Sequence, residues 1–290
     1  MRDMTNSIDR LAFIGFGEAA TAFVSGWGAG RPARLTAFDI KTGSQMQARY
    51  AEHGVAGCLD VAGALKDAQA VFSVVTADQA LAAARAAAQS LPAGAFWFDC
   101  NSCAPGTKRQ AAQVIEAAGG RYVDVAVMAP VHPKRHHVPL LVSGPHAEAA
   151  EAALLSLDMK PKLAGPEVGQ ASSIKMIRSV MIKGMEALSA ECFLAARRAG
   201  VEDSVIASLE ASDPEMEWRR RGAYNLERMM LHGVRRAAEM REVALTVQEL
   251  GLGGGMSAAA ADWQDRIGAL GAAPGEDDLL SRVDALLVRL

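Results

Sequence analysis

The sequence has few cysteines, no strong excess of either charge and no unbroken apolar run long enough to cross a bilayer. Four cysteines in 290 residues are too few for a disulfide framework, which indicates a reducing compartment. A net charge of −3 gives no general affinity for nucleic acid. The first ten residues, MRDMTNSIDR, lack the apolar core of a signal peptide. We therefore expect a cytoplasmic protein with neither nucleic-acid nor membrane partners.

The first half of the chain alternates short apolar segments with helical ones. Strands in this order imply βαβ units and a mainly parallel, doubly wound sheet of the Rossmann type. The expected strands are residues 11–15, 35–39, 70–75, 95–99, 121–127 and 140–143, with helices at 19–27, 44–53, 78–90 and 106–118.

The pattern changes near residues 161–169, after which no strand is predicted. The expected helices are residues 171–199, 204–209, 215–231, 235–250, 257–270 and 277–290. The sequence thus predicts an α/β domain over residues 1–165 and an all-α domain over 166–290.

A glycine turn follows the first strand and opens a helix. The segment Gly15-Phe16-Gly17-Glu18-Ala19-Ala20 reads G-x-G-x-x-A, in which the first glycine allows a tight turn and the second lets a pyrophosphate approach the backbone. The phosphates would then face the amides of a helix N-terminus. The turn therefore predicts a dinucleotide site.

Asp39, at the end of the next strand, lies where such folds hold the ribose hydroxyls. A carboxylate there would repel a 2′-phosphate, although Lys41 stands close by. The acid therefore favours NAD over NADP.

Two further motifs lie downstream. One is Asp99-Cys100-Asn101-Ser102-Cys103-Ala104-Pro105, and the other is Gly169-Gln170-Ala171-Ser172-Ser173-Ile174-Lys175. Together with the glycine turn they resemble the 3-hydroxyacid dehydrogenase family, which includes 3-hydroxyisobutyrate dehydrogenase and, more distantly, 6-phosphogluconate dehydrogenase.

The resemblance assigns roles to particular positions. It implies that Lys175 is the general acid/base and that Asn101 and Ser102 face the substrate and the cofactor. Val75 and Thr76 fall where the family lines the nicotinamide. Ser179 stands where the family usually has asparagine, four residues after the lysine and on the same helix face.

The substrate loop departs from the family. Where the family reads Asp-Ala-Pro-Val-Ser-Gly-Gly, this chain reads Asp124-Val125-Ala126-Val127-Met128-Ala129-Pro130. The serine is missing, and Pro130 has no N–H to donate, so Met128 and Ala129 would line a changed substrate site. The basic segment that follows, which contains Arg135, is a candidate replacement for the lost anion contacts. Arg178 is another, with a structural ion pair as its alternative role.

The stretch from Glu227 to Met240 resembles a subgroup of the superfamily whose helical C-terminal domain is uncharacterised. Arg235 falls within one residue of a family lysine that meets cofactor and substrate, and His232 is a further substrate-site candidate. Paired helical domains, and hence a homodimer, are implied by the resemblance.

No metal site is expected. Cys100 and Cys103 lack a second cysteine pair, and His132, His136 and His137 are interleaved with Lys134 and Arg135, whose charges oppose a cation.

These observations predict an NAD-dependent dehydrogenase or reductase that acts on the CH–OH group of a small anionic 3-hydroxy acid, or on the matching semialdehyde or 3-oxo acid. One alternative is an imine-reductase-like enzyme; imine reductases share this architecture but lack the lysine. The other alternative is a non-catalytic NAD-binding scaffold, which the altered substrate loop favours and the retained Lys175 opposes.

Overall fold

The computed structural model describes residues 8–290, which divide into a unit ending at Met176 and a unit from Ile177 to Leu290. The division falls inside helix α7 (Gln170–Ala199) and not at residue 165, where the sequence pattern placed it. The reason is local, because the first turns of α7 are tied to the sheet. The backbone amide of Ala171, for example, donates to Ser143 Oγ at 2.9 Å.

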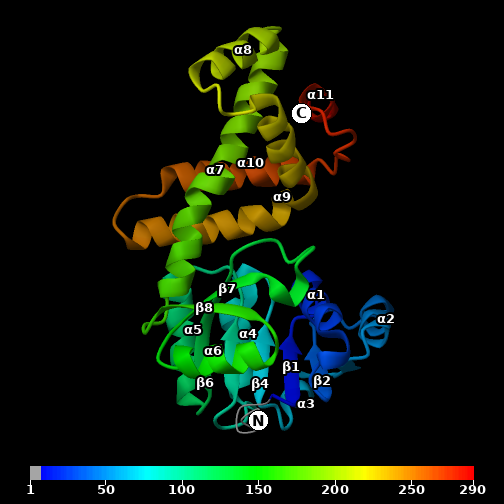
Figure 1. Cartoon of the computed structure of the whole chain (residues 1–290), viewed down its shortest axis with the longest axis vertical. Helices are drawn as coiled ribbons and strands as arrows, with labels where there is room; N and C mark the ends of the chain where they lie inside the picture. The colour runs from blue at the N-terminus through cyan, green and yellow to red at the C-terminus, as the bar shows by residue number, and fades with distance from the viewer. Residues whose placement is uncertain (1–7) are drawn as a thin grey trace. The chain divides into compact units, whose positions relative to one another are not determined.

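The first unit is built on an eight-stranded sheet of order β3-β2-β1-β4-β5-β6-β7-β8 (Figure 1). All neighbouring strands are parallel except β6 and β7. The strand order reverses between β1 and β4, which is where ligands bind in open α/β sheets. The mainly parallel sheet confirms the predicted fold class. The strands are β1 (Arg10–Ile14), β2 (Arg34–Phe38), β3 (Ala56–Gly57), β4 (Ala70–Ser73), β5 (Phe96–Asp99), β6 (Arg121–Val127), β7 (Pro139–Ser143) and β8 (Lys160–Gly165).

The two edge strands, β3 and β8, were missed by the sequence analysis. β3 has only two residues, and β8 reads KPKLAG, with none of its side chains fully buried. An edge strand needs no apolar run, since backbone pairing holds one side of it and solvent covers the other. Lys160–Gly165 is therefore the last strand of the sheet.

Helices cover both faces of the sheet. One face buries Phe13, Phe72 and Phe98 under helices α1, α2 and α6, and the other buries Trp97 under α3, α4 and α5. This alternation is the doubly wound arrangement. The helices are α1 (Glu18–Trp27), α2 (Ser44–Glu52), α3 (Val61–Leu65), α4 (Ala80–Ala88), α5 (Pro105–Ala117) and α6 (Ala147–Ser156), with 3₁₀ turns η2 (Gly28–Gly30), η3 (Ala77–Gln79) and η4 (Arg135–His137).

The second unit is entirely helical among the described residues. It contains the rest of α7, then α8 (Glu202–Ser212), α9 (Trp218–Glu249), α10 (Gly255–Ala269) and α11 (Leu279–Leu287). Its core includes Phe193, Leu226, Met229 and Val283, so the methionine pair at 229–230 fills the core. No helix within residues 8–290 has the length and apolarity needed to cross a membrane.

Helix α9 is continuous, whereas the sequence predicted two helices with a break around Gly233. The glycine is used for packing instead. A Cβ on Gly233 would lie 2.3 Å from the carbonyl oxygen of Gln264, and one on Gly268 would lie 2.5 Å from the amide of Val234. Two facing glycines thus bring the backbones of α9 and α10 into close contact, and Figure 1 shows the two helices side by side.

Candidate functional site

The turn after β1 has the geometry that a dinucleotide site requires. Gly15 has φ +86°, and a Cβ there would lie 2.7 Å from the carbonyl oxygen of Val74. Only glycine fits, because both the left-handed backbone and the close approach exclude a side chain. At Gly17 a Cβ would meet nothing within 4 Å. Its lack of a side chain therefore keeps open space beside the backbone and serves no packing purpose.

The same turn presents an uncapped helix N-terminus. Gly17 is the N-cap of α1, and no side chain accepts its first amides. Unpaired N–H groups and the helix dipole favour an anion there. Glu18 is exposed, Ala19 is half-buried and Ala20 is fully buried, so the third position of the motif packs helix against strand. The cradle fits a pyrophosphate.

Asp39 stands beside this turn, just after β2. Its Oδ2 accepts the amide of Phe16 at 2.8 Å, and its Oδ1 accepts the amide of Lys41 at 2.8 Å. Each carboxylate oxygen has a second lone pair, so the group can also accept hydroxyl donors. Two amides fix its orientation at the place where the sequence predicts the ribose.

The loop after β4 lies directly against the turn. Val75 Cγ1 is 3.0 Å from the position that a Cβ on Gly15 would take, and Thr76 next to it is exposed. Side-chain hydrogen bonds from Gln79 and Thr76 lower the pKa of Asp78. The same hydrogen bonds hold the end of this loop in place. The structure thus brings Val75 and Thr76 next to the dinucleotide turn.

The loop after β5 carries Asn101 and Ser102. Asn101 Nδ2 donates to Asp99 Oδ1 at 2.7 Å and to Ser73 Oγ at 2.9 Å. Because a carboxylate only accepts, these bonds set the orientation of the amide, and the buried Asn101 Oδ1 has no hydrogen-bond partner among residues 8–290. A buried acceptor without a partner is costly, so this oxygen fits a donor from a ligand.

Lys175 reaches the same loop from α7. Its Nζ donates to Ser102 Oγ at 2.7 Å, and the lysine side chain is half-buried. The structure therefore joins two residues that lie 73 positions apart and that the sequence analysis assigned to one site.

A buried charge network supports both of these loops, and the sequence analysis did not foresee it. The register of β5 and β6 pairs Asp99 with Asp124, which places two buried acids side by side. Lys108 of α5 lies between them, with Nζ 3.0 Å from Asp99 Oδ1 and 3.4 Å from Asp124 Oδ1. Tyr122 Oη donates to Asp99 Oδ2 at 2.7 Å.

The charges around Lys108 determine its ionisation. Burial acts to lower the pKa of Lys108, but the two carboxylates outweigh it and raise the pKa above its ordinary value. Lys108 is therefore a permanent cation in the core. The only sequence signal for this network was an acid within each of two apolar strands.

Asp124 also fixes the start of α7. Its Oδ2 accepts the amide of Gly169 at 3.1 Å, the amide of Ser172 at 3.0 Å and the hydroxyl of Ser172 at 3.0 Å. A carboxylate at a helix N-terminus satisfies amides that have no partner within the helix. The acid that opens the substrate loop thus positions the helix turn that carries Lys175.

The candidate substrate-binding residues of the first unit, unlike Lys175 and Ser102, do not gather at one place. The amide of Met128 pairs with the carbonyl of Pro139 at 2.9 Å, and Ala129 packs against the core. Arg135 Nη1 donates to the carbonyl of Ser25 at 3.5 Å. Ser25 lies eight residues after Gly17 along α1, about 12 Å at 1.5 Å per residue. Arg135 is therefore directed at the far part of α1 and not at Ser102.

The candidates of the second unit lie on α7 and α9. Arg178 is exposed, Ser179 is buried and His232 is half-buried. Arg235 donates to Glu239 Oε1 at 2.5 Å, four residues along its helix. Its neighbour Arg236 is the buried one, bonded to Glu186. The sequence analysis placed the family's lysine only to within one residue of Arg235, so it could not distinguish the exposed Arg235 from the buried Arg236.

Lys183 and Glu239 form a second buried contact that the sequence did not reveal. Lys183 Nζ donates to Glu239 Oε2 at 2.6 Å, and burial lowers the pKa of Lys183 despite this carboxylate. The carboxylate of Glu239 therefore accepts hydrogen bonds from both Lys183 and Arg235.

Neither cysteine of the β5 loop forms a disulfide within residues 8–290. Burial raises the pKa of Cys100 to about 12, and Cys103 Sγ donates to the carbonyl of Ala77 at 3.3 Å. Both sulfurs are therefore structural groups.

Comparison with solved structures gives close relatives over the full length. A conserved hypothetical protein from Sinorhizobium meliloti 1021 is 39% identical, covers 100% of this chain and 98% of its own, and has a TM-score of 0.76. The conserved protein MTH1747, described as structurally similar to 3-hydroxyacid dehydrogenases, is 29% identical over 91% of this chain and 100% of its own, with a TM-score of 0.66.

More distant structures share the fold. The 3-hydroxyisobutyrate dehydrogenase of Mycobacterium tuberculosis, solved with L-serine, is 15% identical over 96% of this chain and 99% of its own, with a TM-score of 0.72. An imine reductase from Aspergillus terreus, solved with NADPH4, is 17% identical over 85% and 88%, with a TM-score of 0.57.

Two family models match separate parts of the chain. Residues 10–157 match the NAD-binding domain of 6-phosphogluconate dehydrogenase, and residues 196–267 match a domain of unknown function, DUF1932. The first match spans the sheet and the dinucleotide turn, and the second lies within the helical unit. The chain therefore belongs to the family with the 6-phosphogluconate dehydrogenase NAD-binding domain, as a divergent 3-hydroxyacid-dehydrogenase-like member whose second domain is the DUF1932 type.

Proposed function

We propose that this protein is a dehydrogenase or reductase that moves a hydride between a nicotinamide cofactor and the hydroxyl-bearing carbon of a small anionic 3-hydroxy acid, with Lys175 as general acid/base. The observation that carries the proposal is the 2.7 Å contact between Lys175 Nζ and Ser102 Oγ. It lies at the carboxyl end of β5, two strands from the dinucleotide turn. NAD supplies the hydride acceptor or donor, held by Gly15, Gly17 and Asp39.

The residues around Lys175 divide the remaining work. Lys175 Nζ takes the hydroxyl proton in oxidation and returns it in reduction. Ser102 Oγ accepts a hydrogen bond from Lys175 Nζ and so holds that amino group in place. Asn101 Oδ1, the acceptor without a partner, orients a donor on the substrate or on the carboxamide of the cofactor. Ser179, one turn further along α7, offers a second hydroxyl.

We propose NAD as the preferred cofactor because Asp39 places a negative charge where a 2′-phosphate would go. Both of its oxygens are fixed by backbone amides, so the carboxylate cannot easily turn away. Relatives of this fold nevertheless include an imine reductase solved with NADPH4. Initial rates measured with each cofactor at matched concentrations decide between them.

The anionic group of the substrate must be held differently from the way the family holds it. Pro130 has no N–H, and the amide of Met128 is used by Pro139. We therefore propose that an arginine takes over, with Arg178 as the first candidate because it is exposed and lies three residues after Lys175. Arg235 and His232 are further candidates. A homodimer formed through the helical units is proposed from the family, and sedimentation equilibrium tests it.

The test is a panel of small 3-hydroxy acids with NAD⁺ or NADP⁺, followed by reduced nicotinamide absorbance. For an active substrate, Lys175→Ala should lower kcat by roughly 10²- to 10⁴-fold and leave dinucleotide binding intact. The matched control is Lys162→Ala, which removes an exposed lysine from β8. Near-normal turnover by the Lys175 variant would overturn the assignment of the acid/base.

The same panel separates the alternatives. Imine reductases share the fold, so cyclic imines with NADPH are included, and turnover of imines alone would favour that reading. Silence on every substrate, with tight dinucleotide binding, would favour a non-catalytic scaffold.

A further inference from the structure

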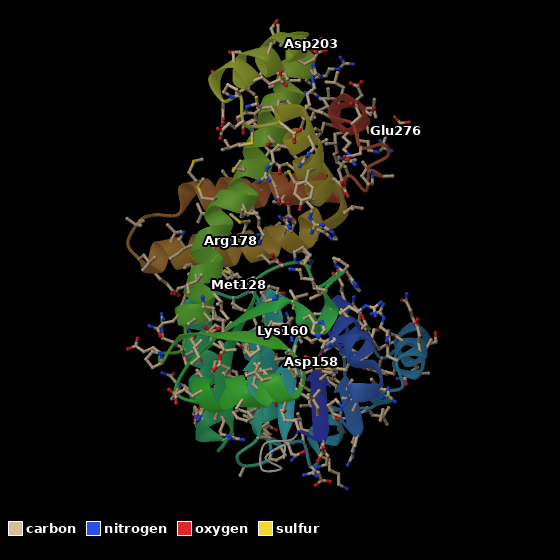
Figure 2. All side chains as sticks on the ribbon, in the orientation of Figure 1. Met128, Asp158, Lys160, Arg178, Asp203 and Glu276 are labelled. Atoms are coloured by element: carbon tan, nitrogen blue, oxygen red, sulfur yellow. The ribbon has the colours of Figure 1, made fainter. Side chains whose placement is uncertain are left out.

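Two histidines and an aspartate from distant parts of the first unit meet on its surface. His136 and His137 belong to the 3₁₀ turn η4, between β6 and β7. Asp158, labelled beside Lys160 in Figure 2, lies in the turn between α6 and β8, 21 residues beyond His137. The sequence analysis could not connect Asp158 with the two histidines, because Asp158 lies far from them along the chain.

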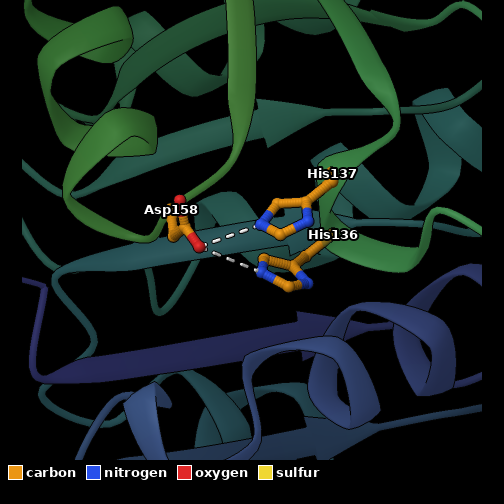
Figure 3. A group of neighbouring side chains, drawn as sticks. All are labelled: His136, His137 and Asp158. Atoms are coloured by element: carbon orange, nitrogen blue, oxygen red, sulfur yellow. Dashed lines mark hydrogen bonds and ion pairs between the residues drawn. The ribbon is translucent and has the colours of Figure 1, made fainter.

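The three side chains converge on one point. His137 Nε2 lies 2.9 Å and His136 Nε2 lies 3.6 Å from the same oxygen, Asp158 Oδ2. All three ligand atoms lie within 4.8 Å of one another. Figure 3 shows both rings pointing their nitrogens at the carboxylate.

These separations match a tetrahedral metal centre. With metal–ligand bonds of about 2.0–2.1 Å, neighbouring ligands of a tetrahedral ion lie about 3.3 Å apart. The observed 2.9 and 3.6 Å lie on either side of that value. Small shifts of the two exposed side chains, His137 and Asp158, would bring these two separations to that value.

The surroundings stabilise this arrangement of ligands. Lys160 Nζ donates to the other carboxylate oxygen, Asp158 Oδ1, at 3.1 Å. This bond leaves Oδ2 available for an ion and orients the carboxylate, as hydrogen bonds to metal ligands commonly do. His136 is buried against Trp27, so its ring is held in place by the packing of the first unit.

The positive neighbours limit the affinity but do not block the site. Arg135 is directed at the carbonyl of Ser25, and Lys134 is exposed. Lys160 remains the nearest cation. Two imidazoles and one carboxylate suit Zn²⁺ and related ions, whereas Mg²⁺ and Ca²⁺ prefer oxygen ligands.

We propose that His136, His137 and Asp158 form a binding site for a zinc-class divalent cation, with the fourth position open to water. A bound ion would join the loop before β7 to the turn before β8, and so hold the edge of the sheet against α1. The site is separate from the Lys175 group and does not depend on the proposed dehydrogenase activity.

The experiment titrates Zn²⁺ into tag-free, chelator-stripped protein and measures free metal with a chromophoric competitor. Asp158→Asn removes the anionic ligand without straining the backbone. Residue 158 has φ +53°, a left-handed conformation that asparagine adopts more readily than most residues. His137→Ala removes a second ligand. We expect one Zn²⁺ per wild-type chain and a loss of affinity of at least tenfold in each variant.

The matched control is His146→Ala. His146 Nε2 also contacts a carboxylate, Glu116 Oε1, at 3.1 Å, but it has no second histidine beside it. This variant should bind Zn²⁺ as the wild type does, and Zn²⁺ should raise the melting temperature of both but not of Asp158→Asn. Absence of binding by the stripped wild type, or unchanged binding by Asp158→Asn, would overturn the proposal.

Discussion

Replacing Lys108 by methionine tests the buried network beneath the site. Methionine has similar length and fills the space, but it leaves Asp99 and Asp124 without their shared cation. Both acids are almost completely buried, and Lys108 Nζ also donates to the carbonyl of Asp99 at 2.6 Å. Removing one partner of a buried ion pair costs about 3–5 kcal/mol. We expect a loss of that size in the free energy of unfolding of the first unit.

The pH dependence gives a second signature. The pKa of folded Lys108 is raised above its unfolded value, so its contribution to stability is complete below about pH 10.5 and is lost as the pH rises through the folded pKa. The wild-type network is therefore intact from pH 6 to 8. The destabilisation of the variant relative to wild type should therefore stay constant over this range and should narrow only as the pH rises above about 10.5, where Lys108 begins to lose its proton in the wild type.

The measurement must report on the first unit alone, because a chain of two units need not unfold in one step. Hydrogen exchange of peptides from β5 and β6, measured under native conditions, gives that local free energy. The control is Lys66→Met, which removes an exposed lysine at the end of α3 and should change stability by less than about 0.5 kcal/mol. A loss below about 1 kcal/mol in Lys108→Met would refute the reasoning.

Three further outcomes are expected. Gly17→Ala should leave the melting temperature unchanged, since a Cβ there meets nothing within 4 Å, yet weaken dinucleotide binding about tenfold or more, ~1.4 kcal/mol; calorimetric titration measures this, and unchanged affinity would contradict the pyrophosphate cradle. Iodoacetamide at pH 8 should label the exposed Cys192 well before Cys100, whose buried thiol has a pKa raised to about 12; mass spectrometry gives the order, and early labelling of Cys100 would argue against its burial. Gly233→Ala should destabilise the helical unit by about 1–3 kcal/mol, because its Cβ would lie 2.3 Å from a backbone oxygen of α10; thermal unfolding tests this against Gly184→Ala, whose Cβ meets nothing within 4 Å.

The parts of the fold that the sequence predicted are those with a local signal. The central strands are short apolar runs, and the turn from Gly15 to Ala20 combines a strand end, two glycines and a helix start. The edge strand β8 has no apolar run and was missed. The gap predicted between helices at residues 232–234 was wrong, and only the presence of α10 shows why the continuous helix keeps a glycine at position 233.

The site divides in the same way. Lys175 and Ser102 were assigned from motifs, and the structure brings them to 2.7 Å. Lys108 lies in a segment, Thr107-Lys108-Arg109-Gln110, that is polar throughout, and nothing local marks one of its members as buried. Its position follows from the pairing of β5 with β6. Contacts that depend on strand register or on remote turns, including Asp158 with the histidines, were beyond the reach of local patterns.

The altered substrate loop can now be separated from Lys175, the proposed acid/base. The family's serine and glycines are absent after Val127, yet the acid that opens the segment, Asp124, is present. Its bonds go to Gly169 and Ser172 at the start of α7 and not toward the loop. Asp124 therefore positions the turn that carries Lys175, whatever follows in the loop. Since one end of the segment anchors the helix and the other is the proposed substrate contact, the second can change without displacing the first. The retained lysine and the lost serine are thus compatible with the proposed enzyme acting on a substrate that differs from those of the family.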